Sequence, residues 1–463
     1  MKISRPVNNN FYEEKPILQS GLTDAFSVKK SAEKKVIDLF SSVYELKLGN
    51  DQLKQTAIKV VDFRTRRFAP DKERLVLKLY SKEIDNVKNY FIQTGLYAGV
   101  LYHKGCKFNI TTKYGDAFLK RMLNFVNDIY IDTKQAPAKK EEIKNQFLFI
   151  IAHLFIQKLE KTSVLGIPQE YIKQHERSHK VRGAVDFNAY LKQDIPFQGK
   201  LTSTFKERCY IQEIVDVLYL TLKKLESIFG KEIHSRLLGI LQLLKQHYSG
   251  RYVTAETIRK AQMHPAINNP IYNGFKKVLE YAEIILMNND LINDEQHNKL
   301  QTSGHLFDIA ELFEIYLEKL LSRNFDEWQV SSQEEAQIYN GKFYNGYMYP
   351  DIVMRHKESN KIVVFDAKFK NMRTIYKDLD RTDLYQIHSY IGYYNPLVIA
   401  GGLLYPLSNE FNIDRCYSNN LFGNRNNEIK FIVDGIYLKE DMTTEQIINS
   451  EENFITRLKN SIQ

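Results

Sequence analysis

The chain has 463 residues, of which 43% are hydrophobic, so it is long and apolar enough for two or three domains with their own cores. Its formal net charge of +9 fits a nucleic-acid partner, because Lys and Arg contacts to phosphates release counterions, but it does not establish one. Three widely spaced cysteines exclude a disulfide framework and indicate no zinc site. No apolar signal segment and no run of 18 apolar residues occur, which predicts a cytoplasmic protein without membrane contact.

The first 110 residues are predicted to form a β-rich N-terminal domain. Short runs rich in β-branched and aromatic residues predict strands over 58–63, 75–80 and 107–111.

Residues 111–300 are predicted to form a mainly helical middle region. Apolar residues at helical intervals predict helices over 118–131, 147–165, 213–225 and 235–248, and a further helix and loop over 268–298. The polar stretch 132–144 predicts an exposed loop. The basic segment 171–201 shows no regular ligand spacing, so we expect an irregular structural segment there rather than a metal or phosphate site.

The third predicted domain covers residues 301–463. The polar residues 298–304 indicate a linker-like boundary, and a helix is expected directly after it, over 305–321. A hairpin, another helix and strands over 397–404 and 431–438 follow, which together indicate one α/β domain. The predicted fold class is therefore a multidomain α+β protein, with a β-rich N-terminal domain, a helical middle region and a C-terminal α/β domain.

The most informative motif lies in this last domain. Pro350-Asp351 is followed, after fourteen residues, by Asp366-Ala367-Lys368, and two strand-like runs joined by a polar turn lie between them. Side chains alternate along a strand, so Asp366 and Lys368 share a face, and a hairpin would bring Asp351 beside them. Two adjacent carboxylates suit Mg²⁺ or Mn²⁺, and a neighbouring lysine can orient water and stabilise phosphate charge. The motif by itself is equally compatible with a surface hairpin that carries solvated charges.

Two helices flank the motif. Glu314 lies beside the apolar stripe of the upstream helix, where a solvated side chain is the ordinary alternative. In the downstream helix Gln386 and Tyr390 share a face at i, i+4, and singly each would be a packing or hydrogen-bonding residue. Arg373, Lys377 and Arg381 form a basic set nearby, which is either a phosphate-contacting surface or a solvated face.

The order of these elements resembles the PD-(D/E)xK nuclease superfamily, and the last helix resembles its RecB-like branch. The resemblance implies that Asp351, Asp366 and the backbone carbonyl of Ala367 bind Mg²⁺ or Mn²⁺, with Glu314 supporting the metal site. It implies a catalytic role for Lys368. It also implies that Gln386 and Tyr390 support the DNA.

Several further segments are similar to the McrC family, the nuclease subunits of McrBC-type, modification-dependent restriction systems. The segments are 114–124, 165–168, 181–187, 199–201 and 306–314. The resemblance implies a metal-dependent endodeoxyribonuclease of a restriction or antiviral defence system that cleaves double-stranded, modified DNA. It also implies a partner, a hexameric AAA+ GTPase of the McrB type, which the N-terminal region would bind and stimulate.

The chain itself has no Gly-x-x-x-x-Gly-Lys-Ser/Thr phosphate loop, which fits a nuclease subunit with a separate motor. Two alternatives stay open from the sequence. One is a RecB-like repair nuclease that acts on DNA ends or flaps, and the other is a non-catalytic DNA-binding adaptor.

Overall fold

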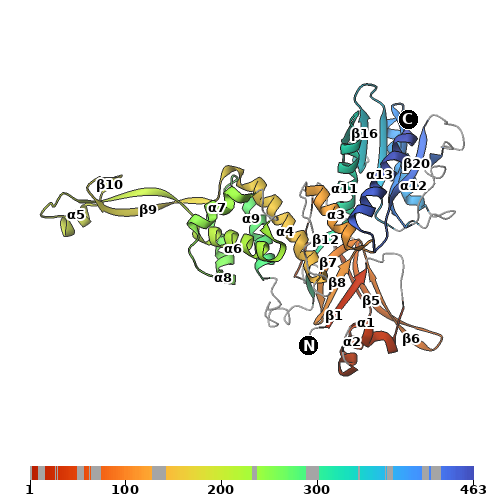
Figure 1. The fold of residues 1–463 in the computed structure, drawn as a ribbon, viewed down its shortest axis with the longest axis horizontal. Coiled ribbons are helices and arrows are strands. Elements are labelled where there is room, and N and C mark those ends of the chain that lie inside the picture. The colour runs from red at the N-terminus through yellow and green to blue at the C-terminus, as the bar shows by residue number, and fades with distance from the viewer. Residues whose placement is uncertain are drawn as a thin grey trace. The chain divides into compact units, whose positions relative to one another are not determined.

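The computed structural model describes most of the chain, and its architecture is mixed α and β (Figure 1). The described residues are 3–8, 16–26, 28, 30–48, 57–61, 63, 74–127, 142–231, 237–287, 302–342, 345–370, 372, 379–408, 417–418 and 429–462. They divide into two compact units. Unit 1 joins Met1–Tyr130 to Asn293–Gln463, and unit 2 is Ile131–Ile292. This division differs from the three consecutive domains that the sequence predicts, because the first and last parts of the chain share one unit.

The N-terminal part of unit 1 contains two sheets. A four-stranded sheet has the order β2-β6-β5-β3, and a five-stranded sheet has the order β1-β8-β7-β12-β4. Short helices α1 (Leu22–Ala25) and α2 (Glu33–Leu39) accompany them. The strands are β1 (Ile3–Asn8), β2 (Ile17–Leu18), β3 (Tyr44–Leu48), β4 (Ala57–Val61), β5 (Arg74–Ile84), β6 (Val87–Thr94), β7 (Tyr97–His103), β8 (Cys106–Thr111) and β12 (Thr302–Asp308).

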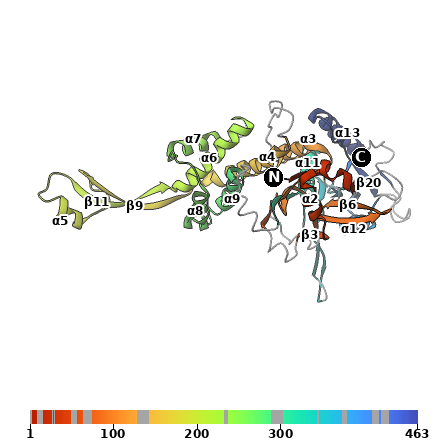
Figure 2. The same ribbon diagram turned by 90° about the horizontal axis from the view of Figure 1, so that it is seen from below.

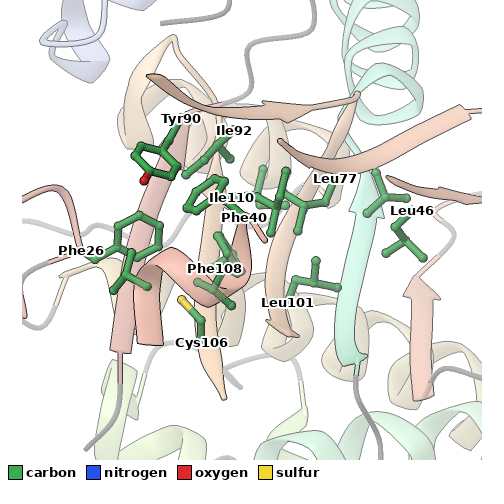
Figure 3. Packing of buried hydrophobic residues seen from close by; sticks show 14 of the residues in the cluster. Phe26, Phe40, Leu46, Leu77, Tyr90, Ile92, Leu101, Cys106, Phe108 and Ile110 are labelled. Atoms are coloured by element: carbon green, nitrogen blue, oxygen red, sulfur yellow. The ribbon is translucent and has the colours of Figure 1, made fainter. Parts of the chain in front are cut away.

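Apolar side chains of both sheets and both helices meet in one core. Figure 3 shows Phe26 and Phe40, which directly follow α1 and α2, beside Phe108 and Ile110 of β8. The rings of Phe26 and Phe108 meet edge to face, with centroids 6.3 Å apart. Because these side chains are almost wholly buried, the β-rich part has a hydrophobic core of its own.

The prediction of a linker over 298–304 is wrong for the C-terminal part of that range. The described residues Thr302–Asp308 form β12, which pairs antiparallel with β7 and parallel with β4 inside the five-stranded sheet. Gly304 is required there, because a Cβ at this position would lie 2.4 Å from the carbonyl oxygen of Val100. The small polar residues that indicated a linker therefore allow close approach of two strands.

The C-terminal part of unit 1 is built on a six-stranded sheet of order β13-β16-β17-β18-β20-β19. Strand β17 pairs antiparallel with β16 and parallel with β18. The strands are β13 (Trp328–Ser331), β16 (Ile352–His356), β17 (Ile362–Ala367), β18 (Val398–Leu407), β19 (Tyr417–Ser418) and β20 (Lys430–Tyr437). A separate two-stranded hairpin is formed by β14 (Ala336–Asn340) and β15 (Asn345–Met348).

Besides the two short helices, the described residues of unit 1 form four more. They are α3 (Gly115–Asn127), α11 (Ile309–Asn324), α12 (Arg381–Tyr394) and α13 (Thr444–Ile462). Helix α11 begins at Ile309, four residues later than predicted, because His305–Asp308 belongs to β12. Asp308 caps the helix by accepting hydrogen bonds from the backbone N–H groups of Ala310 and Glu311.

A buried polar network joins three of these helices. Arg121 of α3 donates two hydrogen bonds, of 2.9 and 2.7 Å, to the carboxylate of Glu451 in α13. The hydroxyl of Tyr316 in α11 donates to the same carboxylate at 2.5 Å. Burial, and then the charge of Glu451, raises the pKa of Tyr316, so the hydroxyl remains a donor. The network therefore connects the N-terminal and C-terminal parts of unit 1 through α11.

Arg121→Ala is expected to lower the free energy of unfolding by about 3–5 kcal/mol, because it leaves the buried Glu451 carboxylate without its charge partner. The measurement is the urea midpoint of the unit 1 transition in the full chain. The control is Lys260→Ala, which removes an exposed ion pair with Glu256 and should cost well under about 1 kcal/mol. Equal effects of the two variants would contradict a stabilising role for the Arg121–Glu451 pair.

Unit 2 contains a helical bundle. Its helices are α4 (Glu142–Thr162), α6 (Gln212–Phe229), α7 (Leu238–His247), α8 (Ala255–Met263) and α9 (Gly274–Met287). The helices predicted over 147–165, 213–225 and 235–248 correspond to α4, α6 and α7 with shifted ends, and the described part of the one predicted over 268–298 corresponds to α9. The helix predicted over 118–131 is α3, which belongs to unit 1, and α8 was not predicted. Most of the predicted loop over 132–144, up to residue 141, lies outside the described residues. Its last three residues, from Glu142 on, belong to α4.

The prediction of an irregular segment over 171–201 is wrong for the first part of that segment. Strand β9 (Gln169–Ser178) pairs along its whole length with β11 (Leu201–Tyr210), and the two form a long ribbon that extends from the bundle (Figures 1 and 2). The short strand β10 (Ala184–Val185) and helix α5 (Phe187–Gln193) lie at its far end. Strand β9 carries mostly polar side chains that are exposed or half-buried, so it lacks the alternation of apolar and polar residues that indicates a strand covered on one face.

Candidate metal centre

Asp351 and Asp366 are brought together by the β16–β17 hairpin. Ile352 pairs with Phe365, so the next residue outward on each strand places Asp351 beside Asp366. The predicted hairpin is therefore present. Both side chains are buried, Asp366 fully, and β17 is buried along its whole length. The alternative of a surface hairpin with solvated charges does not describe this arrangement.

Asp351 is held on both of its oxygens. Its Oδ2 accepts a hydrogen bond from the backbone N–H of Ala367 at 2.9 Å, and its Oδ1 accepts one from the Gln333 amide at 3.0 Å. Burial, and then the nearby charge of Glu314, raises the pKa of Asp351 to about 6. The side chain is therefore fixed in position but carries a charge that its surroundings only partly compensate.

Asp366 has the less compensated carboxylate. Neither oxygen has a hydrogen bond of good geometry within the described residues, although the Lys368 ammonium lies 2.6 Å from Oδ2. Burial, and then the charge of Asp351, raises the pKa of Asp366 well above its ordinary range. A buried carboxylate whose charge is disfavoured both by burial and by a neighbouring carboxylate is one that a bound divalent cation would stabilise.

The donor set fits a hard cation that keeps several waters. Within the described part of the chain, no three His, Cys, Asp or Glu side chains form a group that could hold a metal. The two aspartates and the Ala367 carbonyl would instead supply oxygen ligands on one side only. Mg²⁺ commonly binds in this way, through one or two carboxylates with water in its remaining positions.

Lys368 follows the strand and lies between the carboxylates and α12. Its ammonium donates to Gln386 Oε1 at 3.0 Å and lies 3.8 Å from Asp383 Oδ1. Burial opposes its charge, but the carboxylates of Asp366 and Asp351 outweigh burial and raise the pKa of Lys368. The group therefore stays protonated, which suits the stabilisation of negative charge better than the removal of a proton.

Gln386 and Tyr390 lie on α12 as their spacing predicts. The Gln386 amide donates to the Tyr390 hydroxyl at 2.8 Å, and that hydroxyl in turn lies 3.3 Å from the backbone oxygen of Tyr349. Tyr390 is only 3% exposed. This chain of hydrogen bonds orients Gln386 towards Lys368, so the pair holds the lysine in place and Tyr390 presents little surface to a ligand.

The basic set is only partly described. Arg381 is exposed at the first position of α12. Arg373 and Lys377 lie outside the described residues.

Asp383 was missed by the sequence analysis. It is buried in the first turn of α12, forms an ion pair with Lys370 and lies close to Lys368. An acidic residue in a first helical turn usually only stabilises the helix N-terminus, so no signal distinguished it.

Gln333 was missed as well, and it joins Glu314 to the site. Its amide nitrogen lies 3.0 Å from Asp351 Oδ1 and 3.4 Å from Glu314 Oε2. Its backbone has a φ of 52°, in the left-handed region that non-glycine residues seldom adopt, and its N–H donates to the Pro350 oxygen at 2.9 Å. Such a conformation directs one amide to both carboxylates, and no sequence pattern reports it.

Gln333→Ala is expected to raise the Mg²⁺ concentration that half-saturates the site by roughly tenfold, because loss of one such contact costs on the order of 1–1.5 kcal/mol. Binding is measured by titration calorimetry on the full chain. The control is Gln337→Ala, four residues further on in β14, which should leave metal affinity unchanged. An unaltered isotherm for Gln333→Ala would show that the amide does not organise the carboxylates.

A family model described as McrBC 5-methylcytosine restriction system component matches residues 92–406. A solved half-complex from a tetradecameric assembly of Thermococcus gammatolerans McrB AAA+ hexamers with bound McrC contains a similar chain, 16% identical, with a TM-score of 0.50. The match covers 99% of this chain and 100% of that chain. At this identity the likeness shows a shared fold alone.

A second solved structure, the Thermococcus gammatolerans McrBC complex, is 16% identical with a TM-score of 0.32, over 70% of this chain and 88% of that chain. No curated protein matches the chain. No described helix is long and apolar enough to cross a membrane.

Proposed function

This chain belongs to the family of McrBC 5-methylcytosine restriction system components, and on that premise we propose that it is the subunit that cuts DNA. The observation that carries the proposal is the buried Asp351–Asp366 pair with Lys368 beside it. Burying two like charges side by side is costly for a structural protein, and the cost is explained if the site binds a metal and acts on a phosphodiester. The arrangement resembles that of a PD-(D/E)xK nuclease, which supports the proposal.

The site residues would divide the work of hydrolysis. Asp351, Asp366 and the Ala367 carbonyl would hold Mg²⁺ or Mn²⁺, with Glu314 supporting them through water or directly. Once bound, the ion would polarise the phosphate and lower the pKa of a coordinated water. Lys368, kept protonated by the carboxylates, would orient the attacking water and stabilise the charge that develops on the phosphate oxygens. Gln386, backed by Tyr390, would hold the ammonium in that position.

The basic residues near α12 would contact DNA phosphates. Arg381 supports this proposal, because a cation at a helix N-terminus opposes the helix dipole and so does not serve helix stability. Replacing Arg373, Lys377 and Arg381 together with alanine should weaken DNA binding for all sequences alike. It should also reduce the slope of log affinity against log salt by up to about 3. An unchanged salt slope would remove the three residues from the interface.

A partner motor would supply recognition and movement. One solved structure that shares this fold is an assembly of McrB AAA+ hexamers with bound McrC. We place the corresponding contact within the first 300 residues of this chain, which include the β-rich part and the ribbon of unit 2. The ribbon supports this placement because several large apolar side chains are exposed near its far end. These are Val181, Phe187, Leu191, Ile195 and Phe197.

The test uses the full chain, its cognate AAA+ partner, GTP, Mg²⁺ and closed circular DNA. With 5-methylcytosine in the DNA we expect cleavage that needs both proteins, together with faster GTP turnover when the chain is added to the partner. Efficient cutting of unmodified DNA by the chain alone would instead support a repair nuclease, as would a requirement for DNA ends. Stimulated GTP turnover without any cleavage would support the non-catalytic adaptor.

A further inference from the structure

The β14–β15 hairpin leaves directly from the metal centre. Its first strand begins three residues after Gln333, and its second strand ends three residues before Asp351. The hydrogen bond from the Gln333 N–H to the Pro350 oxygen, at 2.9 Å, closes the base of the hairpin. One end of the hairpin is therefore anchored at Gln333, which contacts the Asp351 carboxylate, and the other at Pro350, which directly precedes Asp351. The hairpin thus begins and ends beside the candidate metal centre.

The hairpin exposes large side chains that its own packing does not use. It forms a two-stranded sheet separate from the six-stranded one. Ile338, Tyr339 and Tyr347 are 51%, 47% and 36% exposed. An isolated two-stranded hairpin is marginally stable in water, so three exposed large side chains on such short strands indicate a surface that contacts something else.

The chemistry of this surface suits nucleic acid. Residues 336–350 contain no Asp or Glu, one Lys, four Tyr and three side-chain amides. On one face the Gln337 amide donates across the strands to Asn345 Oδ1 at 3.1 Å and to the Tyr347 hydroxyl at 3.2 Å. Amides and hydroxyls of this kind donate to phosphates and base edges, and no carboxylate in the segment repels the DNA backbone.

We propose that the β14–β15 hairpin is a DNA-contacting element that lies against the duplex next to the scissile phosphate. The inference rests on the proposed nuclease function, since the metal centre fixes where the duplex must pass. The major groove of B-DNA accommodates a two-stranded β-ribbon, which is the shape that the hairpin presents. Its contacts would be made by Gln337, Asn340 and Tyr347, with Lys342 near a phosphate.

The test introduces negative charge without changing side-chain shape. The double substitution Gln337→Glu and Asn340→Asp is made in a full chain whose cleavage is blocked by Asp366→Asn. Affinity for a fluorescent duplex containing 5-methylcytosine is measured in the presence of the partner. We expect affinity to fall roughly tenfold or more, because carboxylates would face phosphates. The matched control is Gln246→Glu, an equally isosteric change on the exposed face of α7, which should leave affinity unchanged.

A second measurement does not depend on affinity. Lys342→Cys carrying a photo-cross-linker should form an adduct with the duplex, whereas the same probe at Gln246→Cys should not. The hairpin inference alone would be overturned by the following combination. The wild type cleaves DNA, the charged variant binds DNA with unchanged affinity, and the probe at position 342 forms no adduct. Loss of partner binding with unchanged DNA affinity would also overturn it and identify a protein-docking surface. Failure of the wild-type pair to cleave or bind DNA would overturn the proposed function as well.

Discussion

Replacing Asp366 with asparagine is expected to abolish DNA cleavage while the chain remains folded. The substitution keeps the shape of the side chain but removes one of two metal-binding carboxylates. Loss of several kcal/mol of transition-state stabilisation corresponds to a rate at least about 1,000-fold lower. Cleavage is measured with partner, GTP and Mg²⁺. Binding of Mg²⁺ or Mn²⁺ is measured separately as the rise in melting temperature that each metal produces.

The same variant should be at least as stable as the wild type when no metal is present. The folded state raises the pKa of Asp366 above its ordinary value of 3.8, chiefly by burial. A raised pKa contributes stability below the unfolded-state pKa, and that contribution is lost as the pH rises through the folded-state pKa. Relative to Asp366→Asn, the metal-free wild type should therefore lose stability from about pH 4 upward. Added Mg²⁺ should stabilise only the wild type.

The control for Asp366→Asn is Glu358→Gln, which changes an exposed carboxylate in the turn of the same hairpin. It should cleave at the wild-type rate and respond normally to metal. Cleavage by Asp366→Asn at a rate close to that of the wild type would show that the metal centre is elsewhere.

Lys368→Ala should lower the cleavage rate by about 100- to 1,000-fold, the effect of removing one well-placed donor to a developing negative charge. Metal affinity should stay nearly unchanged, because the lysine is not a ligand. Rate and metal binding are measured on the same preparation. A lysine needed only to compensate the charge of the carboxylates would have a structural role. In that case Lys368→Ala would alter metal binding as severely as Asp366→Asn does, which would contradict a catalytic role.

Lys361→Ala provides the matched control for Lys368→Ala. Lys361 is exposed and lies just before β17, at the end of the strand opposite Lys368. Its removal changes the charge of the chain by the same amount but leaves the metal centre intact, so cleavage should be unaffected. A similar loss in both variants would mean that net charge, rather than the position of Lys368, determines the rate.

Much of the candidate site follows from local sequence. The hairpin that joins Asp351 to Asp366 is specified by two β-branched runs around a polar turn, and the alternation of a strand places Lys368 on the same face. The i, i+4 spacing of Gln386 and Tyr390 is likewise a local property of a helix. The family resemblance seen in the sequence is confirmed by the match over residues 92–406.

Other parts of the site depend on backbone geometry that composition does not report. Gln333 reaches Glu314 and Asp351 only because its φ is 52°, and the polar stretch around it is otherwise typical of a loop. Asp383 becomes part of the site because α12 lies against the end of β17. In both cases an ordinary polar residue acquires its role from the element next to it.

The sequence by itself determined the hairpin and helices that carry the site residues, the order of those residues, and the family. Only the tertiary structure decided how distant segments combine. Residues 302–304 are polar or small and indicated a linker, and residues 305–308 were assigned to a helix, yet together they form β12 in a sheet whose other strands all lie within the first 111 residues. The physical reason is that strand pairing is satisfied by backbone hydrogen bonds from any partner that fits, and close approach at Gly304 favours the small residue that local patterns assign to a linker.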